Sequence, residues 1–203
     1  IGNWLDQIEE NKNKQWDDDV NKMNEALLKE GFDSPIMEVY SPPRINDMAH
    51  KLGMIPGLSL DLTTMDTDGK PWDFNVKEKR CKAEKMVRDK RAVLLIGSPM
   101  CAAFSQLQRL NINRMSPEDV QQVTERGRVH LEFCAKLYKI QADNQLYFLH
   151  EHPSTASSWK NPKIMELLER PSVKRVVSHM CAFGMMQEKD GIEMLVKKLS
   201  IIQ

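Results

Sequence analysis

The length and composition of the chain exclude several classes of protein. With 203 residues, it can form one compact domain with a hydrophobic core, but it is too short for two domains of ordinary size. Its 29 basic and 29 acidic residues cancel, so a nucleic-acid contact cannot rest on bulk positive charge and must be local. No apolar run approaches the roughly 20 residues that span a bilayer, so we expect a soluble protein without membrane contact.

The cysteines indicate a reducing compartment. Cys81, Cys101, Cys134 and Cys181 are widely spaced, and no two of them form a C-x-x-C pair. The first residues do not resemble a charged-then-apolar signal sequence. We therefore expect an intracellular protein, nuclear or cytoplasmic.

The periodicity of apolar residues predicts an α/β fold. Residues 1–34 are charged with apolar side chains at helical spacing, which indicates an N-terminal segment of one or two helices. Further on, strands are expected at 36–40, 57–62, 92–96, 146–149, 173–177 and 195–202, and helices at 45–52, 77–90, 117–141 and 162–169. This alternation predicts that residues 35–203 form a Rossmann-like, doubly wound and mostly parallel sheet with helices on both faces.

Two of these elements have clear local signals. Ser116-Pro117-Glu118-Asp119 combines a capping hydroxyl, a proline at the first helical position and two acids in the first turn of a helix. Residues 92–96 are entirely apolar, as in a central parallel strand. Ligands of parallel sheets bind at the carboxyl ends of the strands. The turns after the strands are therefore the first places to look for a site.

One of these turns contains a cysteine. Residues 97–101, Gly-Ser-Pro-Met-Cys, place the Cys101 thiol at the carboxyl end of a strand, where a thiolate could attack an electrophile. An isolated cysteine is more often a small buried side chain packed like alanine. The next strand ends in His150-Glu151-His152, however, and a glutamate in apolar surroundings can serve as a general acid. The two turns together favour chemistry at this edge.

The same three residues raise the question of a metal site. Imidazole and carboxylate groups ligate zinc, and His150 and His152 would share one face of an extended strand. No third or fourth ligand follows at a recognisable spacing. We therefore predict no metal site, and we expect both histidines to lie at the surface or to support the catalytic residues.

In their order, these motifs resemble those of cytosine-5 DNA methyltransferases, especially members from phages and mobile elements. The segment Gly-Ser-Pro-x-Cys-x-x-Phe-Ser at 97–105 resembles the fourth motif of the family, and Glu-x-Pro at 151–153 resembles the sixth. Residues 38–41 resemble the first motif, 72–74 the third and 183–189 the eighth. Asp61 stands where an acid closes the second strand. The resemblance extends over residues 36–190.

The resemblance implies methyl transfer from S-adenosylmethionine to C5 of cytosine in DNA. The cytosine would be flipped out of the duplex, Cys101 would add to its C6, and Glu151 would contact N3 and the exocyclic amine. The implied cofactor-binding residues are Tyr40, Ser41, Asp61, Asp73, Phe74 and Pro99. The implied nucleic-acid contacts are Ser105, Arg109, Gln187 and Lys189.

The first motif departs from the pattern of the family. Its glycines are replaced by Ser41-Pro42-Pro43-Arg44, which removes amide donors and adds bulk where a cofactor should approach the backbone. We therefore expect weaker binding of S-adenosylmethionine than the family shows. The chain also has no segment resembling a target-recognition domain, so reading a DNA sequence would require a further segment or a partner chain.

Two other functions stay open from the sequence. A non-catalytic descendant could keep the fold to bind nucleic acid or a protein partner, which the altered first motif and the neutral charge favour. A different cysteine enzyme, such as a hydrolase, could instead pair Cys101 with His150 or His152, because thiol and imidazole lie at adjacent strand ends.

Overall fold

The chain has an α/β architecture, seen in a computed structural model that describes residues 2–90, 92–112, 114–179, 182, 186–189, 192–195 and 199–202. The helices are α1 (Gly2–Lys29), α2 (Arg44–Lys51), α3 (Lys77–Lys90), α4 (Gln106–Ile112), α5 (Pro117–Asp143) and α6 (Pro162–Leu168), with short 3-10 helices η1 (Ala102–Phe104) and η2 (Ser157–Lys160). The strands are β1 (Ile36–Val39), β2 (Leu58–Leu60), β3 (Leu94–Gly97), β4 (Tyr147–Pro153), β5 (Val176–His179), β6 (Met186–Lys189), β7 (Ile192–Leu195) and β8 (Leu199–Ile202).

The main sheet has the strand order β2-β1-β3-β4-β8-β5. The first four strands are parallel, whereas β8 runs antiparallel to both of its neighbours. Val39 is in register with Gly97, and Gly97 with His150, so β1 and β3 end at one edge, and β4 continues three residues further, to Pro153. A parallel sheet of this order is compatible with a Rossmann-like fold, and it brings the turns after β1 and β3 together.

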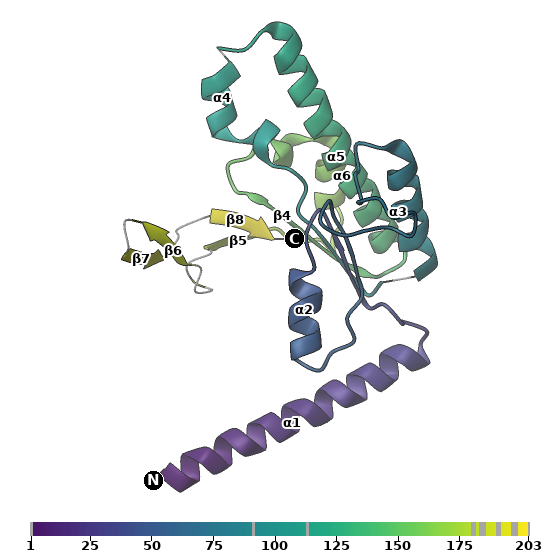
Figure 1. Cartoon of the computed structure of the whole chain (residues 1–203), viewed down its shortest axis with the longest axis vertical. Helices are drawn as coiled ribbons and strands as arrows, with labels where there is room; N and C mark the ends of the chain where they lie inside the picture. Colours follow the sequence, from purple (N-terminus) through teal and green to yellow (C-terminus); the bar gives the residue numbers. More distant parts are fainter. Residues whose placement is uncertain are drawn as a thin grey trace.

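Helices pack against both faces of the parallel strands. On one face, alternate strand residues such as Met37 and Leu95 join the core formed with α3, α5 and α6. On the other face, Ile36 and Ile96 pack with Ala49 of α2. This division follows from the two-residue period of a strand, and Figure 1 shows α2 on the opposite side of the sheet from α3 and α5.

The long helix α5 forms much of the core, and its start confirms the capping signal. The Ser116 hydroxyl accepts a hydrogen bond from the Asp119 amide at 3.1 Å, and Pro117 occupies the first turn. Ten of its residues are buried, so the helix is fixed firmly across the back of β3 and β4. Helix α3 also has its expected bounds, with Ala83 and Val87 buried.

The N-terminal segment is one helix, α1, which extends away from the sheet (Figure 1). Its last turns hold it to the domain: Val20 is buried, and Asn24 pairs with the Gly53 carbonyl at 2.8 Å and the Ile55 amide at 3.2 Å. Residues 12–19, in contrast, are all exposed. None of the helices in the described ranges has the length and apolar character needed to cross a membrane.

The C-terminal strands differ from the sequence-based prediction. The strand expected at 173–177 is found at Val176–His179, and the one expected at 195–202 is β8, Leu199–Ile202. Strand β8 inserts between β4 and β5, and β6 and β7 form a separate two-stranded sheet. The local sequence patterns of these short strands are similar, so they do not specify which strand pairs with which. The order of the strands is decided by contacts with their partners in the folded sheet.

Candidate functional site

A pocket lies at the carboxyl ends of β1 and β2, against α5. Its volume is about 120 Å³, and it is lined by Tyr40, Asp61, Leu62, Trp72, Asp73, Phe74, Asn75, Ser98, Met100, Arg126 and His130. Most sites for small ligands enclose roughly 300–1,000 Å³, so this one suits a group the size of a nucleobase. The structure brings together four of the six predicted cofactor residues here: Tyr40, Asp61, Asp73 and Phe74.

Tyr40 is held in an unusual backbone conformation directly after β1. Its φ of 59° lies in the left-handed region, which is uncommon for a bulky residue and concentrates at functional sites. The ring packs on Phe74 with centroids 4.8 Å apart. Burial raises the pKa of the Tyr40 phenol above its ordinary value, so the hydroxyl stays protonated and donates to His130 Nδ1 at 2.7 Å.

His130 of α5 is a pocket residue that sequence reasoning missed. Burial lowers its pKa, and the positive charges of Arg126 and Arg80 lower it further, so the imidazole is neutral. Because Nδ1 accepts from Tyr40, Nε2 carries the proton and donates to Asn75 Oδ1 at 3.1 Å. The signal in the sequence is a stripe of polar side chains, His130, Cys134 and Tyr138, spaced by four on the buried face of α5.

Both predicted cofactor carboxylates are held in local turns. Asp73 Oδ1 accepts from the Asn75 amide at 2.9 Å and from its side chain at 2.7 Å, and the backbone hydrogen bond is the main cause that lowers the Asp73 pKa. Asp61 Oδ1 accepts from the Thr63 amide at 3.0 Å and hydroxyl at 2.9 Å. Each turn therefore fixes its carboxylate through one oxygen. The Oδ2 atom of Asp73 has no hydrogen bond within the described part of the chain.

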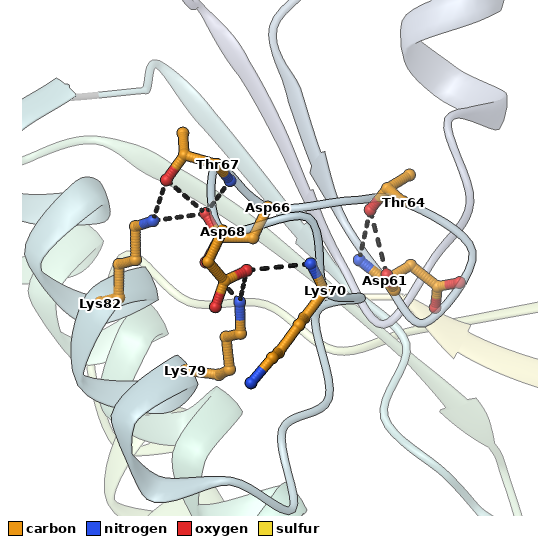
Figure 2. Close-up of polar contacts among 8 residues, drawn as sticks. All are labelled: Asp61, Thr64, Asp66, Thr67, Asp68, Lys70, Lys79 and Lys82. Carbon is orange, nitrogen blue, oxygen red and sulfur yellow. Dashed lines mark hydrogen bonds and ion pairs between the residues drawn. The ribbon is translucent and has the colours of Figure 1, made fainter.

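The loop that joins these two aspartates is anchored to α3 (Figure 2). Asp66 is buried and forms ion pairs with Lys79, at 2.5 Å, and with Lys82. Burial alone would raise the pKa of Asp66, but the hydrogen bonds from both lysines outweigh it and lower the pKa. The two ammonium groups also lie 5.2 and 5.5 Å from the centre of the Trp72 ring. The anchor thus holds the middle of the loop to α3 and lies beside Trp72, next to Asp73.

Ser41 and Pro99, the other two predicted cofactor residues, do not line the pocket. The Ser41 hydroxyl donates to Glu38 Oε1 at 3.0 Å. Pro99 is buried, and its carbonyl accepts from His152 Nε2 at 2.9 Å. The structure therefore gives both residues contacts inside the protein.

Glu38 is fully buried at the end of β1 and fills the amino end of α2. Its carboxylate accepts from the backbone amides of Ile45 at 3.2 Å and Asn46 at 3.0 Å. The side chains of Asn46 and Ser59 donate to Oε2 at 3.0 Å each. Anions commonly bind to free amides at the start of a helix. Here the protein supplies the anion itself.

The turn that carries Cys101 is packed closely at both ends. Gly97 is required at its start, because an added Cβ would lie 2.0 Å from the Tyr138 hydroxyl. Past the cysteine, Gly127 of α5 allows Ala103 to approach, since a Cβ on this glycine would lie 2.5 Å from that of Ala103. Cys101 itself is half-buried and not in a disulfide.

Of the two places expected for His150 and His152, at the surface or in support of the catalytic residues, the first is wrong, because the two side chains are only 0% and 1% exposed. They share the face of β4 that packs on α5 and η2, as the strand period predicts. His150 Nδ1 lies 3.0 Å from the Tyr138 hydroxyl, and burial lowers the pKa of His150 well below its ordinary value. Glu151, between them, is half-buried and belongs to the opposite face of the strand.

Among the residues that the structure describes, no three His, Cys, Asp or Glu side chains are grouped so as to hold a metal ion. The cluster His150-Glu151-His152 is divided between two faces of β4, so its members do not converge.

The predicted nucleic-acid contacts are only partly described. The Ser105 hydroxyl accepts from the Gln108 amide at 3.2 Å and so caps the start of α4. Arg109 lies in α4, and Gln187 and Lys189 lie in β6, but their side chains are outside the described part of the structure. Residues 183–185 of the expected eighth motif also fall outside the described residues.

No protein-family model, curated protein or solved structure matches this chain.

Proposed function

We propose that this chain is a cytosine-5 DNA methyltransferase-like domain with a doubly wound Rossmann-like core that uses S-adenosylmethionine. The observation that carries the proposal is the convergence of Tyr40, Asp61, Asp73 and Phe74 on one pocket. These residues come from three separate segments of the chain, namely the turn after β1, the end of β2 and residues 72–74, each of which resembles a different part of the family. The same pocket includes Ser98 and Met100, the residues on either side of Pro99 in the Cys101 turn.

The pocket residues suit the nucleoside end of this cofactor. The Tyr40, Trp72 and Phe74 rings offer apolar surface for a base, and the second oxygen of Asp73 can accept from an exocyclic amine. The carboxylate of Asp61 can accept from ribose hydroxyls. A bound S-adenosylmethionine would supply the electrophilic methyl group.

Cys101 and Glu151 have the proposed chemical roles. Cys101 adds as thiolate to C6 of a flipped cytosine, and Glu151 holds N3 and the exocyclic amine, which makes C5 nucleophilic. After methylation, loss of the C5 proton expels the cysteine. Both residues are half-buried at the ends of neighbouring parallel strands, where a base could reach them.

The hydrolase alternative has less support from the geometry. A general base must lie within hydrogen-bonding reach of the thiol. Both ring nitrogens of His152 are bonded elsewhere, Nδ1 to Ser158 at 2.7 Å and Nε2 to Pro99 at 2.9 Å. His150 is fully enclosed, with Nδ1 3.0 Å from the Tyr138 hydroxyl and Nε2 without a hydrogen-bond partner among the described residues. Neither histidine makes a hydrogen bond to Cys101 in the described part of the chain.

A second candidate is a non-catalytic module that binds nucleic acid or protein. It is favoured by the Glu38 network, which uses the α2 amides that a cofactor of an α/β sheet often contacts. Binding of the cofactor separates the two candidates.

Calorimetric titration with S-adenosylmethionine and with S-adenosylhomocysteine tests the cofactor. We expect saturable binding and a raised melting temperature, because a ligand stabilises the state that binds it. Asp73→Asn should weaken binding, whereas Asp89→Asn, in an exposed pair with Lys85, should leave it unchanged. Absence of binding to the unaltered protein at millimolar ligand would contradict the methyltransferase proposal and leave the non-catalytic module.

Covalent trapping tests the nucleophile. On DNA that contains 5-fluorocytosine, the fluorine cannot leave as a proton does, so the cysteine adduct should persist when cofactor is present. The adduct should disappear in Cys101→Ser and remain in Cys81→Ser, which alters an exposed thiol on α3. An adduct that survives Cys101→Ser would exclude Cys101 as the nucleophile.

A further inference from the structure

The turn that carries Cys101 is tied to the end of β4 by one buried side chain. His152 is 1% exposed, and its Nε2 lies 2.9 Å from the carbonyl oxygen of Pro99, two residues before the cysteine. A carbonyl can only accept, so Nε2 carries the proton and donates it. The contact therefore joins two strand ends through a side chain and not through the sheet ladder.

Ser158 fixes the form of the imidazole that makes this contact. In the neutral imidazole with its proton on Nε2, the other nitrogen, Nδ1, is an acceptor, and the Ser158 hydroxyl, 2.7 Å away, donates to it. Ser158 lies in η2 and is itself 1% exposed. This arrangement has the pattern of an oriented histidine, in which the bond to one nitrogen decides the role of the other.

The remaining contacts of the turn lie on either side of Pro99. Tyr138 meets Gly97 at the start, the Ser98 amide donates to the Val39 carbonyl at 3.2 Å, and Gly127 meets Ala103 after the cysteine. Of the residues between Ser98 and Ala103, Pro99 has the contact with His152, and the Cys101 carbonyl accepts from the Phe104 amide at 3.0 Å. Met100 is exposed and the Cys101 side chain is half-buried. The Pro99 carbonyl is thus the fixed point nearest to the thiol on its amino-terminal side.

We infer that His152 is a positioning residue that holds the Cys101 turn through the Pro99 carbonyl. Its contribution to a reaction rests on the proposed function, in which Cys101 is the nucleophile, but its effect on the thiol does not. Loss of the Nε2 donor frees the turn and makes Cys101 more accessible to a small reagent. The same loss makes the thiol less well placed for a bound base.

Two substitutions separate the hydrogen bond from simple packing. In His152→Gln the side-chain amide can replace Nε2 and still donate to Pro99. In His152→Asn the shorter amide replaces Nδ1, so it can meet Ser158 but does not reach Pro99. The two variants differ by one methylene, and both are polar and smaller than histidine.

Alkylation by iodoacetamide, followed by peptide mass spectrometry, measures the effect with controls inside the same chain. Cys81 is exposed and gives the reference rate, and Cys134 is fully buried and reports opening of the whole core. We expect His152→Asn to raise the rate at Cys101 relative to Cys81 by about fivefold, the factor of one net hydrogen bond. His152→Gln should keep the wild-type ratio, and Cys134 should stay protected in both.

Several outcomes would overturn the inference. If the alkylation rate at Cys101 changes equally in the two variants, or in neither, the hydrogen bond from residue 152 to Pro99 does not control the turn. Labelling of Cys134 together with Cys101 would assign His152 to core stability instead. The assay requires neither cofactor nor DNA. If the wild-type protein forms no adduct with 5-fluorocytosine, the proposed function fails while the labelling result still stands.

Discussion

The turns after β1 and β3 lie next to each other at the same edge of the sheet, where the Ser98 amide donates to the Val39 carbonyl at 3.2 Å. They are stabilised in different ways. The turn after β1 surrounds an internal carboxylate, Glu38, which takes up the nearby amides and hydroxyls. The turn after β3 is held by groups from other elements, Tyr138 and His152. The first is a closed polar network, whereas the second leaves the side chain at its centre, Cys101, half-buried.

The largest effect should come from removing the centre of the first turn. Glu38→Ala leaves the amides of Ile45 and Asn46 without their acceptor inside the protein. Because each unsatisfied buried group costs about 1–3 kcal/mol, we expect these two amides to lower the free energy of unfolding by at least about 2 kcal/mol. Urea denaturation measures it. Glu38→Gln, which keeps one acceptor oxygen, should lose less, and equal losses would argue against the hydrogen-bond network.

The second turn should respond to an added methyl group at its start. Gly97→Ala forces a Cβ to within 2.0 Å of the Tyr138 hydroxyl, and overpacking of this kind costs about 1–3 kcal/mol. The double variant Gly97→Ala/Tyr138→Phe removes the hydroxyl but leaves the ring carbon Cζ at 2.9 Å, so it should recover only part of the loss. Urea denaturation measures the free energy of unfolding of each variant. If the losses of the two single variants simply add in the double variant, the added methyl group and the Tyr138 hydroxyl are not in contact.

Acid should destabilise the protein through two buried histidines, one near each turn. Burial lowers the pKa of His130 and of His150, with Arg126 and Arg80 adding to the effect at His130 and His152 at His150. Histidine in the unfolded chain has a pKa of about 6.5, so below this pH the unfolded chain binds protons at these two positions that the folded chain does not bind. The free energy of unfolding should therefore be highest above this pH and fall by up to about 1.4 kcal/mol per pH unit for each histidine.

Urea denaturation between pH 7.5 and 5.5 checks this dependence on acid. His130→Gln should flatten the slope, whereas His179→Gln, which alters an exposed histidine of β5, should keep it. A slope that is unchanged in His130→Gln would remove this histidine from the explanation.

The smallest effect is expected from the hydroxyl of Tyr40. Tyr40→Phe keeps the ring against Phe74 but removes the donor to His130 Nδ1, which should cost about 0.5–1.5 kcal/mol. Tyr147→Phe, at a side chain that is 69% exposed, is the matched control and should have no measurable effect. Equal effects of the two substitutions in urea denaturation would mean that the Tyr40 bond contributes nothing.

Local signals in the sequence were sufficient to predict most of the helices and parallel strands. The capping residues at Ser116 predicted the start of α5, and the apolar run at 92–96 predicted the central strand, which the structure has at Leu94–Gly97. The insertion of β8 between β4 and β5 could not be predicted in this way. Strand pairing depends on distant partners, and short strands of similar composition can pair in several orders.

The candidate site was predictable where residues follow strands, and less so where they come from helices. Tyr40, Asp61 and Asp73 were found from their positions after strands and in motifs, but His130 and Arg126 lie in the middle of α5. The burial of His152 could not be predicted from the sequence either. A polar side chain can be buried only if distant groups satisfy it, and its partners Pro99 and Ser158 are not visible from local pattern.

Helix α5 contacts both turns, and its geometry decides how far apart they are. His130 bonds to Tyr40 of the first turn, and Gly127, three residues earlier, meets Ala103 beyond the second. Three residues of α-helix rise by about 4.5 Å, so the two contacts lie within one helical turn of each other. The distance between the pocket and the Cys101 turn is thus fixed by the regular geometry of α5. A tilt of α5 would move both turns together, whereas motion within either loop alone would meet the resistance of the same helix.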